Sequence, residues 1–210
     1  LKEKNVNVEL NSDNLRLSFS SIETYIKCPF SYFVKYILGV DEREENKIDA
    51  RTIGNIYHEV LEKVFLKVIN EEIDIRNVET RQEAIKKEID IVLSNNENLK
   101  YITQNEKTKN FILNLKRMLL NNIMIFALQI EHGKFNVKYV EKEFGKDSEI
   151  KGIEFVRKDG KKVSLSGKID RVDTYEENNK VYLKVIDYKT GNKKFDLKDV
   201  ERGINLQLII

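Results

Sequence analysis

Residues 167–191 read Gly167-Lys-Ile-Asp170-Arg-Val-Asp-Thr-Tyr175-Glu-Glu-Asn178-Asn179-Lys180-Val-Tyr-Leu-Lys-Val-Ile-Asp187-Tyr-Lys189-Thr-Gly191. Two alternating runs, 166–175 and 181–188, are rich in β-branched and aromatic residues and flank a polar turn. Paired asparagines tolerate the positive φ that a two-residue hairpin loop requires. The stretch therefore predicts a β-hairpin with Asn178 and Asn179 at its tip.

The register of this hairpin brings two acids together. If the asparagines form the loop, Glu177 lies opposite Lys180 and Asp170 lies opposite Asp187. Opposed residues share a face with Cβ atoms about 4.5–5.5 Å apart, so the two carboxylates repel unless a cation joins them. Lys189 is expected on the same side, and a divalent cation would remove the remaining repulsion. A loop of another length would shift this pairing.

A purely structural interpretation of the same residues stays open. Asp170 could pair with Arg171 or Lys168, and Asp187 could form an exposed ion pair with Lys189 at the end of a strand. The acids arrive in register, however, and a turn and a helix-like segment follow the second strand. We therefore favour a functional site.

Apolar residues at helical spacing predict a long helix over 51–70, with His58 and Glu62 one turn apart on its flank. A histidine beside an apolar stripe is more often structural than a ligand. Other helices are expected at about 20–28, opened by a Ser20/Glu23 capping box, at 30–38 and at 106–132. Another follows a Thr80/Glu83 capping box.

Strands are expected at 137–144 and 153–157, before the strand that carries Asp170. Glu141 and Glu143 on the first of these could serve the site, although exposed strand acids are the more common case. The result is an α/β protein with a small sheet and helices on its faces.

Length and composition limit the possibilities. We expect 210 residues to form one domain, with residues 1–14 as a linker or lead-in. The chain begins without Met and stops in an apolar run, so we expect a fragment of a longer protein. With 34% charged residues, no apolar run near the ~18 residues of a membrane span and a single cysteine, we expect a cytoplasmic protein without membrane partners.

The net charge of +2 gives no sign of a nucleic-acid partner, so phosphate binding requires local clusters of basic residues. One such cluster follows the second acid and comprises Lys189, Lys193, Lys194 and Lys198. A second flanks the turn before the first acid and comprises Arg157, Lys158, Lys161 and Lys162. These clusters are either DNA-binding surfaces or ordinary solvated faces.

Several motifs in this order resemble a known family. The chain resembles the RecB-like branch of the PD-(D/E)xK nucleases in three motifs: Gly167-x-Ile-Asp170-Arg, Ile186-Asp187-Tyr-Lys189-Thr-Gly191 and Leu206-Gln207-Leu. It resembles the nuclease domain of the AddB subunit of AddAB-type helicase/nucleases in two upstream motifs: Ser18-Phe-Ser20-Ser-Ile-Glu-Thr-Tyr25-x-x-Cys28-Pro29-Phe30-x-Tyr-Phe33 and Gly54-x-x-x-His58-x-x-Leu61-Glu62.

The resemblance implies a restriction-endonuclease-like core, a mixed sheet flanked by helices with a helical insertion at about 71–133. It assigns 15–210 to one nuclease domain, with a helical part at about 15–133, a sheet and active-site core at about 134–210, and a missing C-terminal part. It also implies that four residues ligate Mg²⁺ or Mn²⁺: His58, Asp170, Asp187 and, through its carbonyl, Tyr188.

By the same resemblance, Asp170, Asp187, Lys189 and Gln207 are catalytic. Lys189 would stabilise developing negative charge or position the hydroxide, and Gln207 would orient Lys189 or the DNA backbone. The tyrosine that the family places four residues after this glutamine would fall beyond the last residue.

The family context implies an exonuclease that trims DNA ends during double-strand break repair, together with the AddA subunit of the helicase/nuclease. Cys28 would join three later cysteines in a [4Fe-4S] cluster of the full-length protein only, because such a cluster needs four thiolates. Two alternatives remain: a stand-alone or CRISPR-associated RecB-like exonuclease, and a non-catalytic DNA-binding module on the same fold.

Overall fold

The computed structural model describes residues 14–40, 49–96, 99, 106–145, 148–189 and 198. Its central strand is β4, Lys162–Glu177. The chain divides into two compact units that share β4. Unit one comprises residues 1–45, 143–168 and 192–210, and unit two comprises residues 46–142 and 169–191.

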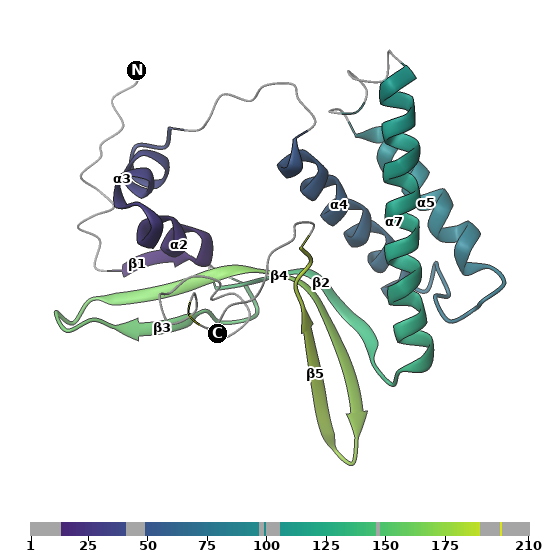
Figure 1. Cartoon of the computed structure of the whole chain (residues 1–210). Coiled ribbons are helices and arrows are strands. Elements are labelled where there is room, and N and C mark those ends of the chain that lie inside the picture. Colours follow the sequence, from purple (N-terminus) through teal and green to yellow (C-terminus); the bar gives the residue numbers. More distant parts are fainter. Residues whose placement is uncertain are drawn as a thin grey trace. The chain divides into compact units, whose positions relative to one another are not determined.

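The fold is α/β, and the described residues form a mixed sheet of five strands (Figure 1). Strand β1, Asn14–Ser18, pairs with β4 in parallel, and β3, Ile153–Val156, pairs with it antiparallel. Strand β2, Asn136–Phe144, and strand β5, Lys180–Ile186, are also neighbours of β4. The predicted fold class is confirmed. The parallel strand β1 was not predicted, because its five residues gain strand partners only when distant residues 162–166 lie beside them.

Unit one carries helix α2, Phe19–Lys27, helix α3, Pro29–Tyr32, and the π-helical turn η1, Phe33–Ile37. The predicted Ser20/Glu23 capping box was wrong, since Ser18 is the N-cap and exchanges hydrogen bonds with Ser21. Gly39 has φ +63°, as expected of a residue that ends a helix.

The close approach of two strands in unit one requires Gly167. A Cβ atom built there would lie 2.9 Å from the ring of Phe144, which also packs against Phe19. Packing in this fold therefore explains why a glycine stands at the start of the Gly167-x-Ile-Asp170-Arg motif.

Among its described residues, unit two has three long helices that lie side by side in Figure 1: α4, Ala50–Ile69, α5, Arg81–Asn95, and α7, Glu106–His132. The predicted helices over 51–70 and 106–132 are confirmed. Thr80 is the N-cap of α5 but makes no side-chain capping bond, so the expected box with Glu83 was wrong. Glu83 instead lies 4.0 Å from Lys86.

The core of unit two is formed by apolar stripes of these helices. Its fully buried members include Val60, Leu61, Val64, Phe65, Ile85, Leu119, Ile123 and Ala127. These stripes are the period-3.6 patterns of the sequence. They place α4, which carries His58, against the helices and strands that follow it in the chain.

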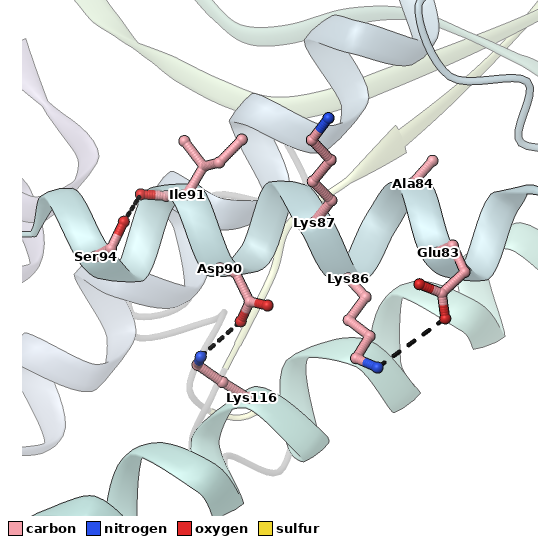
Figure 2. A pocket seen from close by; sticks show the side chains of 8 residues that line it. All are labelled: Glu83, Ala84, Lys86, Lys87, Asp90, Ile91, Ser94 and Lys116. Atoms are coloured by element: carbon pink, nitrogen blue, oxygen red, sulfur yellow. Dashed lines mark hydrogen bonds and ion pairs between the residues drawn. The ribbon is translucent and has the colours of Figure 1, made fainter.

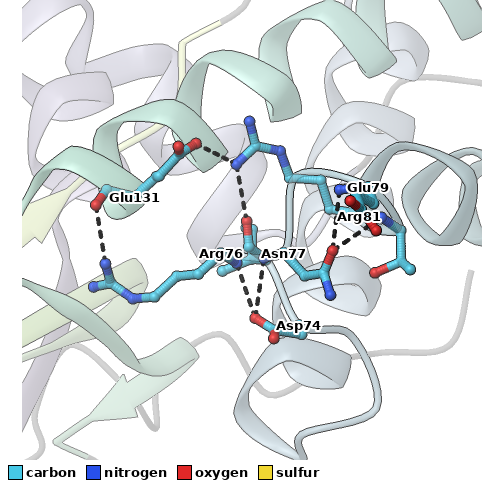
Figure 3. A network of polar contacts seen from close by, with 8 residues as sticks. Asp74, Arg76, Asn77, Glu79, Arg81 and Glu131 are labelled. Carbon is cyan, nitrogen blue, oxygen red and sulfur yellow. Dashed lines mark hydrogen bonds and ion pairs between the residues drawn. The ribbon is translucent and has the colours of Figure 1, made fainter.

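An arginine closes the C-terminal end of α7 (Figure 3). Arg76 donates hydrogen bonds to the carbonyl of Glu131 at 3.2 Å, the carbonyl of Gly133 at 3.4 Å and Oδ1 of Asn136 at 3.1 Å. Arg81, almost fully buried, pairs with the Glu131 carboxylate at 2.5 Å. The last carbonyls of a helix have no partner within it, and Arg76 supplies a side-chain donor to that of Glu131.

Part of α7, Lys109–His132, is long and apolar enough to cross a membrane by length and composition alone. This differs from the expectation that no apolar run approaches that length. Leu115, Leu119, Ile123 and Ile130 on the same helix belong to the core of unit two. A core helix can pass the same test of length and hydropathy.

Candidate metal centre

The predicted hairpin and its register are confirmed. Residues 171–177 of β4 pair with residues 180–186 of β5, from Arg171 opposite Ile186 to Glu177 opposite Lys180. Asn178 and Asn179 have φ of +52° and +57°, as a type I′ turn requires. Asp170 and Asp187 therefore lie one position beyond the last pair of the ladder.

Strand β5 ends two residues before its predicted end. The backbone N–H of Tyr188 donates to the carboxylate of Asp170, with 2.6 Å between N and Oδ2. The side chain of Asp170 thus binds the main chain of the segment that carries Asp187. Arg171 pairs with Asp173 rather than with Asp170, so this pairing of the purely structural interpretation was wrong, whereas its Asp187–Lys189 pair is present.

His58, on α4, faces two carboxylates from one side of its ring. Its Nδ1 lies 3.5 Å from Oε1 of Glu141 and 3.6 Å from Oδ1 of Asp170. On the other side, its Nε2 lies 3.2 Å from the carbonyl oxygen of Tyr188. The structure thus brings His58, Asp170 and Tyr188 together, all within unit two.

Glu141 was undervalued by sequence reasoning, which favoured an exposed strand acid. Its side chain is only 13% exposed, whereas Glu143 two residues later is exposed. Glu141 has φ +47°, and residues 140–142 are all half-buried, which breaks the alternation of the strand. Such irregularities re-aim side chains near active sites. Because alternation assumes a regular strand, no signal in the sequence identifies this turn of the backbone.

Asp187 and Lys189 form a close ion pair. Lys189 Nζ lies 2.9 Å from Oδ1 and 2.8 Å from Oδ2 of Asp187. The aspartate side chain is 15% exposed and that of the lysine 45% exposed. Among the described residues, the buried Oδ2 accepts no hydrogen bond of good geometry. Lys189 therefore offsets the charge of Asp187 without saturating the carboxylate.

The electrostatics of Asp170 show a crowded anionic site. Burial, together with the nearby charges of Asp187 and Glu141, raises the pKa of Asp170 above its ordinary value. The Tyr188 N–H and His58 act in the opposite direction. A carboxylate in this situation is stabilised in its charged form by an added cation.

The donor set fits a divalent cation. The ligand atoms of His58, Glu141 and Asp170 all lie within 4.8 Å of one another. Metal–ligand bonds of about 2.1 Å place neighbouring ligands of an octahedral cation about 3 Å apart and opposite ones about 4 Å apart. The observed separations are close to that range. Carboxylate oxygens favour hard divalent cations and an imidazole nitrogen favours transition metals, so the donor set fits a divalent cation without selecting one.

The structure describes only some of the other residues of the predicted site. Gln207, Lys193 and Lys194 lie outside the described residues. Lys198 is exposed and belongs to unit one. Cys28 is half-buried in unit one, where hydrogen bonds from Ser31 lower the pKa of its thiol.

A depression of about 900 Å³ between α5 and α7 is lined by none of the predicted site residues (Figure 2). Two of its three lysines have acidic partners: Lys116 lies 2.6 Å from Asp90, and Lys86 lies 4.0 Å from Glu83. Among the described residues, the group of histidine and acidic side chains that could hold a metal ion is His58, Glu141 and Asp170, none of which lines this depression.

Comparison with known proteins identifies the family of the chain. The PD-(D/E)XK nuclease superfamily matches residues 16–210. The chain belongs to this superfamily. Among its relatives, the B subunit of the ATP-dependent helicase/deoxyribonuclease from Clostridium kluyveri is 34% identical over 203 residues, which is 96% of this chain and 18% of the relative. The protein of the same name from Clostridioides difficile is 31% identical over 220 residues, again 18% of its length. The chain thus spans about one-fifth of these superfamily relatives.

Proposed function

We propose that this chain is the metal-dependent nuclease domain of an AddB-type subunit of a helicase/deoxyribonuclease and hydrolyses DNA at broken ends largely without regard to sequence. The observation that carries the proposal is the cluster of His58, Glu141 and Asp170 beside the Asp187–Lys189 pair. Membership in a nuclease superfamily and the names of the relatives support the substrate class.

The residues that would hold Mg²⁺ or Mn²⁺ are His58, Glu141, Asp170, Asp187 and the carbonyl of Tyr188. A bound divalent cation polarises a phosphate and lowers the pKa of water. The protein's contribution is to present these donors before the substrate arrives.

Lys189 is in position to act on charge rather than on the cation. Its ammonium lies beside Asp187 and is 45% exposed, so it can reach a phosphate in solvent. Negative charge that develops on the phosphate in the transition state would attract the Lys189 ammonium away from Asp187.

A nuclease of this kind reads the backbone of DNA. Phosphate contacts carry no sequence information and weaken with salt, so cleavage should be salt-sensitive and tolerant of sequence. The relatives' names are the reason for including a helicase step and an AddA-type partner in the proposal. The described residues account for neither.

The test is DNA cleavage with Mg²⁺ or Mn²⁺ by the full chain and three variants, with Mn²⁺ binding followed by calorimetry. Lys189→Ala should abolish cleavage while Mn²⁺ still binds, and Asp187→Ala should lose both. Lys180→Ala, an exposed lysine at the far end of the hairpin, is the matched control and should keep both. Wild-type cleavage rates in Lys189→Ala would overturn the assigned role, and a wild-type chain without metal-dependent cleavage would overturn the function.

A further inference from the structure

A buried ion pair lies next to the metal centre and takes no part in the chemistry described above. Arg171 and Asp173, two residues apart on β4, have side chains that are 0% and 1% exposed. Nε of Arg171 lies 2.8 Å from Oδ1 of Asp173, and its Nη2 donates to Oδ2 at 2.9 Å. A pair so far from solvent carries a desolvation cost that a pair of apolar side chains would avoid.

The arginine makes further contacts beyond this pair. Its Nη1 donates a hydrogen bond to the phenolic oxygen of Tyr188 at 3.2 Å. Its guanidinium lies 4.5 Å from the ring centroid of Phe65, 5.0 Å from that of Phe126 and 6.0 Å from that of Tyr188. Arg171 therefore fixes the Tyr188 ring both at its hydroxyl and over its face.

The main chain of Tyr188 is the part that contacts the metal centre. Its N–H donates to Asp170, its carbonyl oxygen lies 3.2 Å from His58 Nε2, and it separates Asp187 from Lys189 in the sequence. No regular strand holds this segment, because β5 ends at Ile186. The ring of Tyr188, 5% exposed, is thus the anchor of a segment whose backbone touches two of the proposed ligands.

We propose that the buried Arg171–Asp173 pair is a positioning device that fixes Tyr188 and, through its main chain, sets the geometry of the metal ligands. The proposal rests on the proposed metal-dependent function. Arg171 and Asp173 touch neither cation nor DNA and act only through Tyr188. Burial raises the pKa of the Tyr188 hydroxyl above its ordinary value, so the phenol stays neutral and serves as an acceptor for Arg171.

A double variant separates the positioning role from a merely structural one. Removing one partner leaves an uncompensated buried charge and endangers folding, whereas replacing both with apolar residues is often neutral or stabilising. Arg171→Met with Asp173→Val therefore keeps a folded core and loses the hold on Tyr188. A structural role predicts wild-type metal affinity in this variant, while the positioning role predicts a loss.

The experiment measures Mn²⁺ affinity by calorimetry on the full chain, with thermal unfolding as a parallel reading. The double variant should bind Mn²⁺ about 10- to 100-fold more weakly than wild type, the range found when residues that orient metal ligands are removed. Tyr188→Phe, which removes only the hydroxyl, should fall between the two. Arg81→Met with Glu131→Leu removes a different ion pair of unit two, one between a buried arginine and a glutamate, and should leave the affinity unchanged.

The outcomes distinguish this proposal from the function on which it rests. If wild type binds no Mn²⁺, the metal-dependent function fails. If wild type binds Mn²⁺ and the folded double variant matches it within twofold, the positioning role is overturned. Should the double variant not fold, Tyr188→Phe decides, and an unchanged affinity there also overturns the proposal.

Discussion

Replacing Glu141 with glutamine should weaken Mn²⁺ binding at least about 10-fold, or about 1.4 kcal/mol, because the change removes an anionic donor 3.5 Å from His58 Nδ1. The same change should stabilise the cation-free protein. The ligand oxygens of Glu141 and Asp170 lie within 4.8 Å of each other, which corresponds to a repulsion on the order of 3 kcal/mol at an effective dielectric constant near 20.

The backbone of Glu141 adds a second effect. Its φ of +47° is a left-handed conformation that costs a non-glycine residue about 1–2 kcal/mol. Glu141→Gly should therefore be more stable than Glu141→Gln without cation and equally poor at binding Mn²⁺. Strain at this position would then be the cost of aiming a carboxylate at His58.

The assay combines calorimetric Mn²⁺ titration with chemical unfolding in EDTA. Glu143→Gln is the matched control, since it makes the same charge change on the same strand at an exposed residue, and it should leave Mn²⁺ affinity within about twofold. If Glu141→Gln binds Mn²⁺ as wild type does, or is less stable than wild type in EDTA, the role assigned to this residue is refuted.

Three further predictions concern stability and the single cysteine. Leu119→Ala should lower the free energy of unfolding by about 2–5 kcal/mol in urea titrations, because Leu119 is fully buried in the core of unit two; a loss under about 1 kcal/mol would contradict its placement. The hydrogen bond from Arg81 lowers the pKa of Glu131 from its ordinary 4.5, so this pair should stabilise the fold above that pH and lose the effect as pH falls through the lower folded value. The urea midpoints of wild type and Glu131→Gln should converge in acid, and a gap that persists there would contradict the pairing. The 210-residue chain, with Cys28 as its single cysteine, should contain no stoichiometric iron by visible absorption and metal analysis; a brown protein would sink that expectation.

The parts of the fold that sequence predicts best are those with a clear period. The apolar stripe of α4 and the Asn178-Asn179 tip of the hairpin give bounds and register close to the observed ones. In both cases local residues decide the structure, so no knowledge of distant partners is needed.

The parts that sequence misses depend on contacts between distant residues. β1 becomes a strand through its pairing with residues 162–166, and β5 stops short because Asp170 takes the N–H of Tyr188. Glu141 itself has a left-handed backbone conformation, which strand alternation does not reveal, and its side chain faces His58. The motifs that carry Asp170 and His58, in contrast, are local patterns, so the sequence alone singles out both residues as site candidates. Only the fold brings their side chains close together.

The most direct test of the central claim is the position of a Mn²⁺ ion by anomalous scattering from crystals of the protein grown with that metal. We expect a peak about 2.1–2.3 Å from a carboxylate oxygen of Asp170 and near a ring nitrogen of His58, with Glu141 or Asp187 as a further ligand. A protein that crystallises with Mn²⁺ and shows no peak there, or shows its only peak away from these residues, would contradict the proposed metal centre.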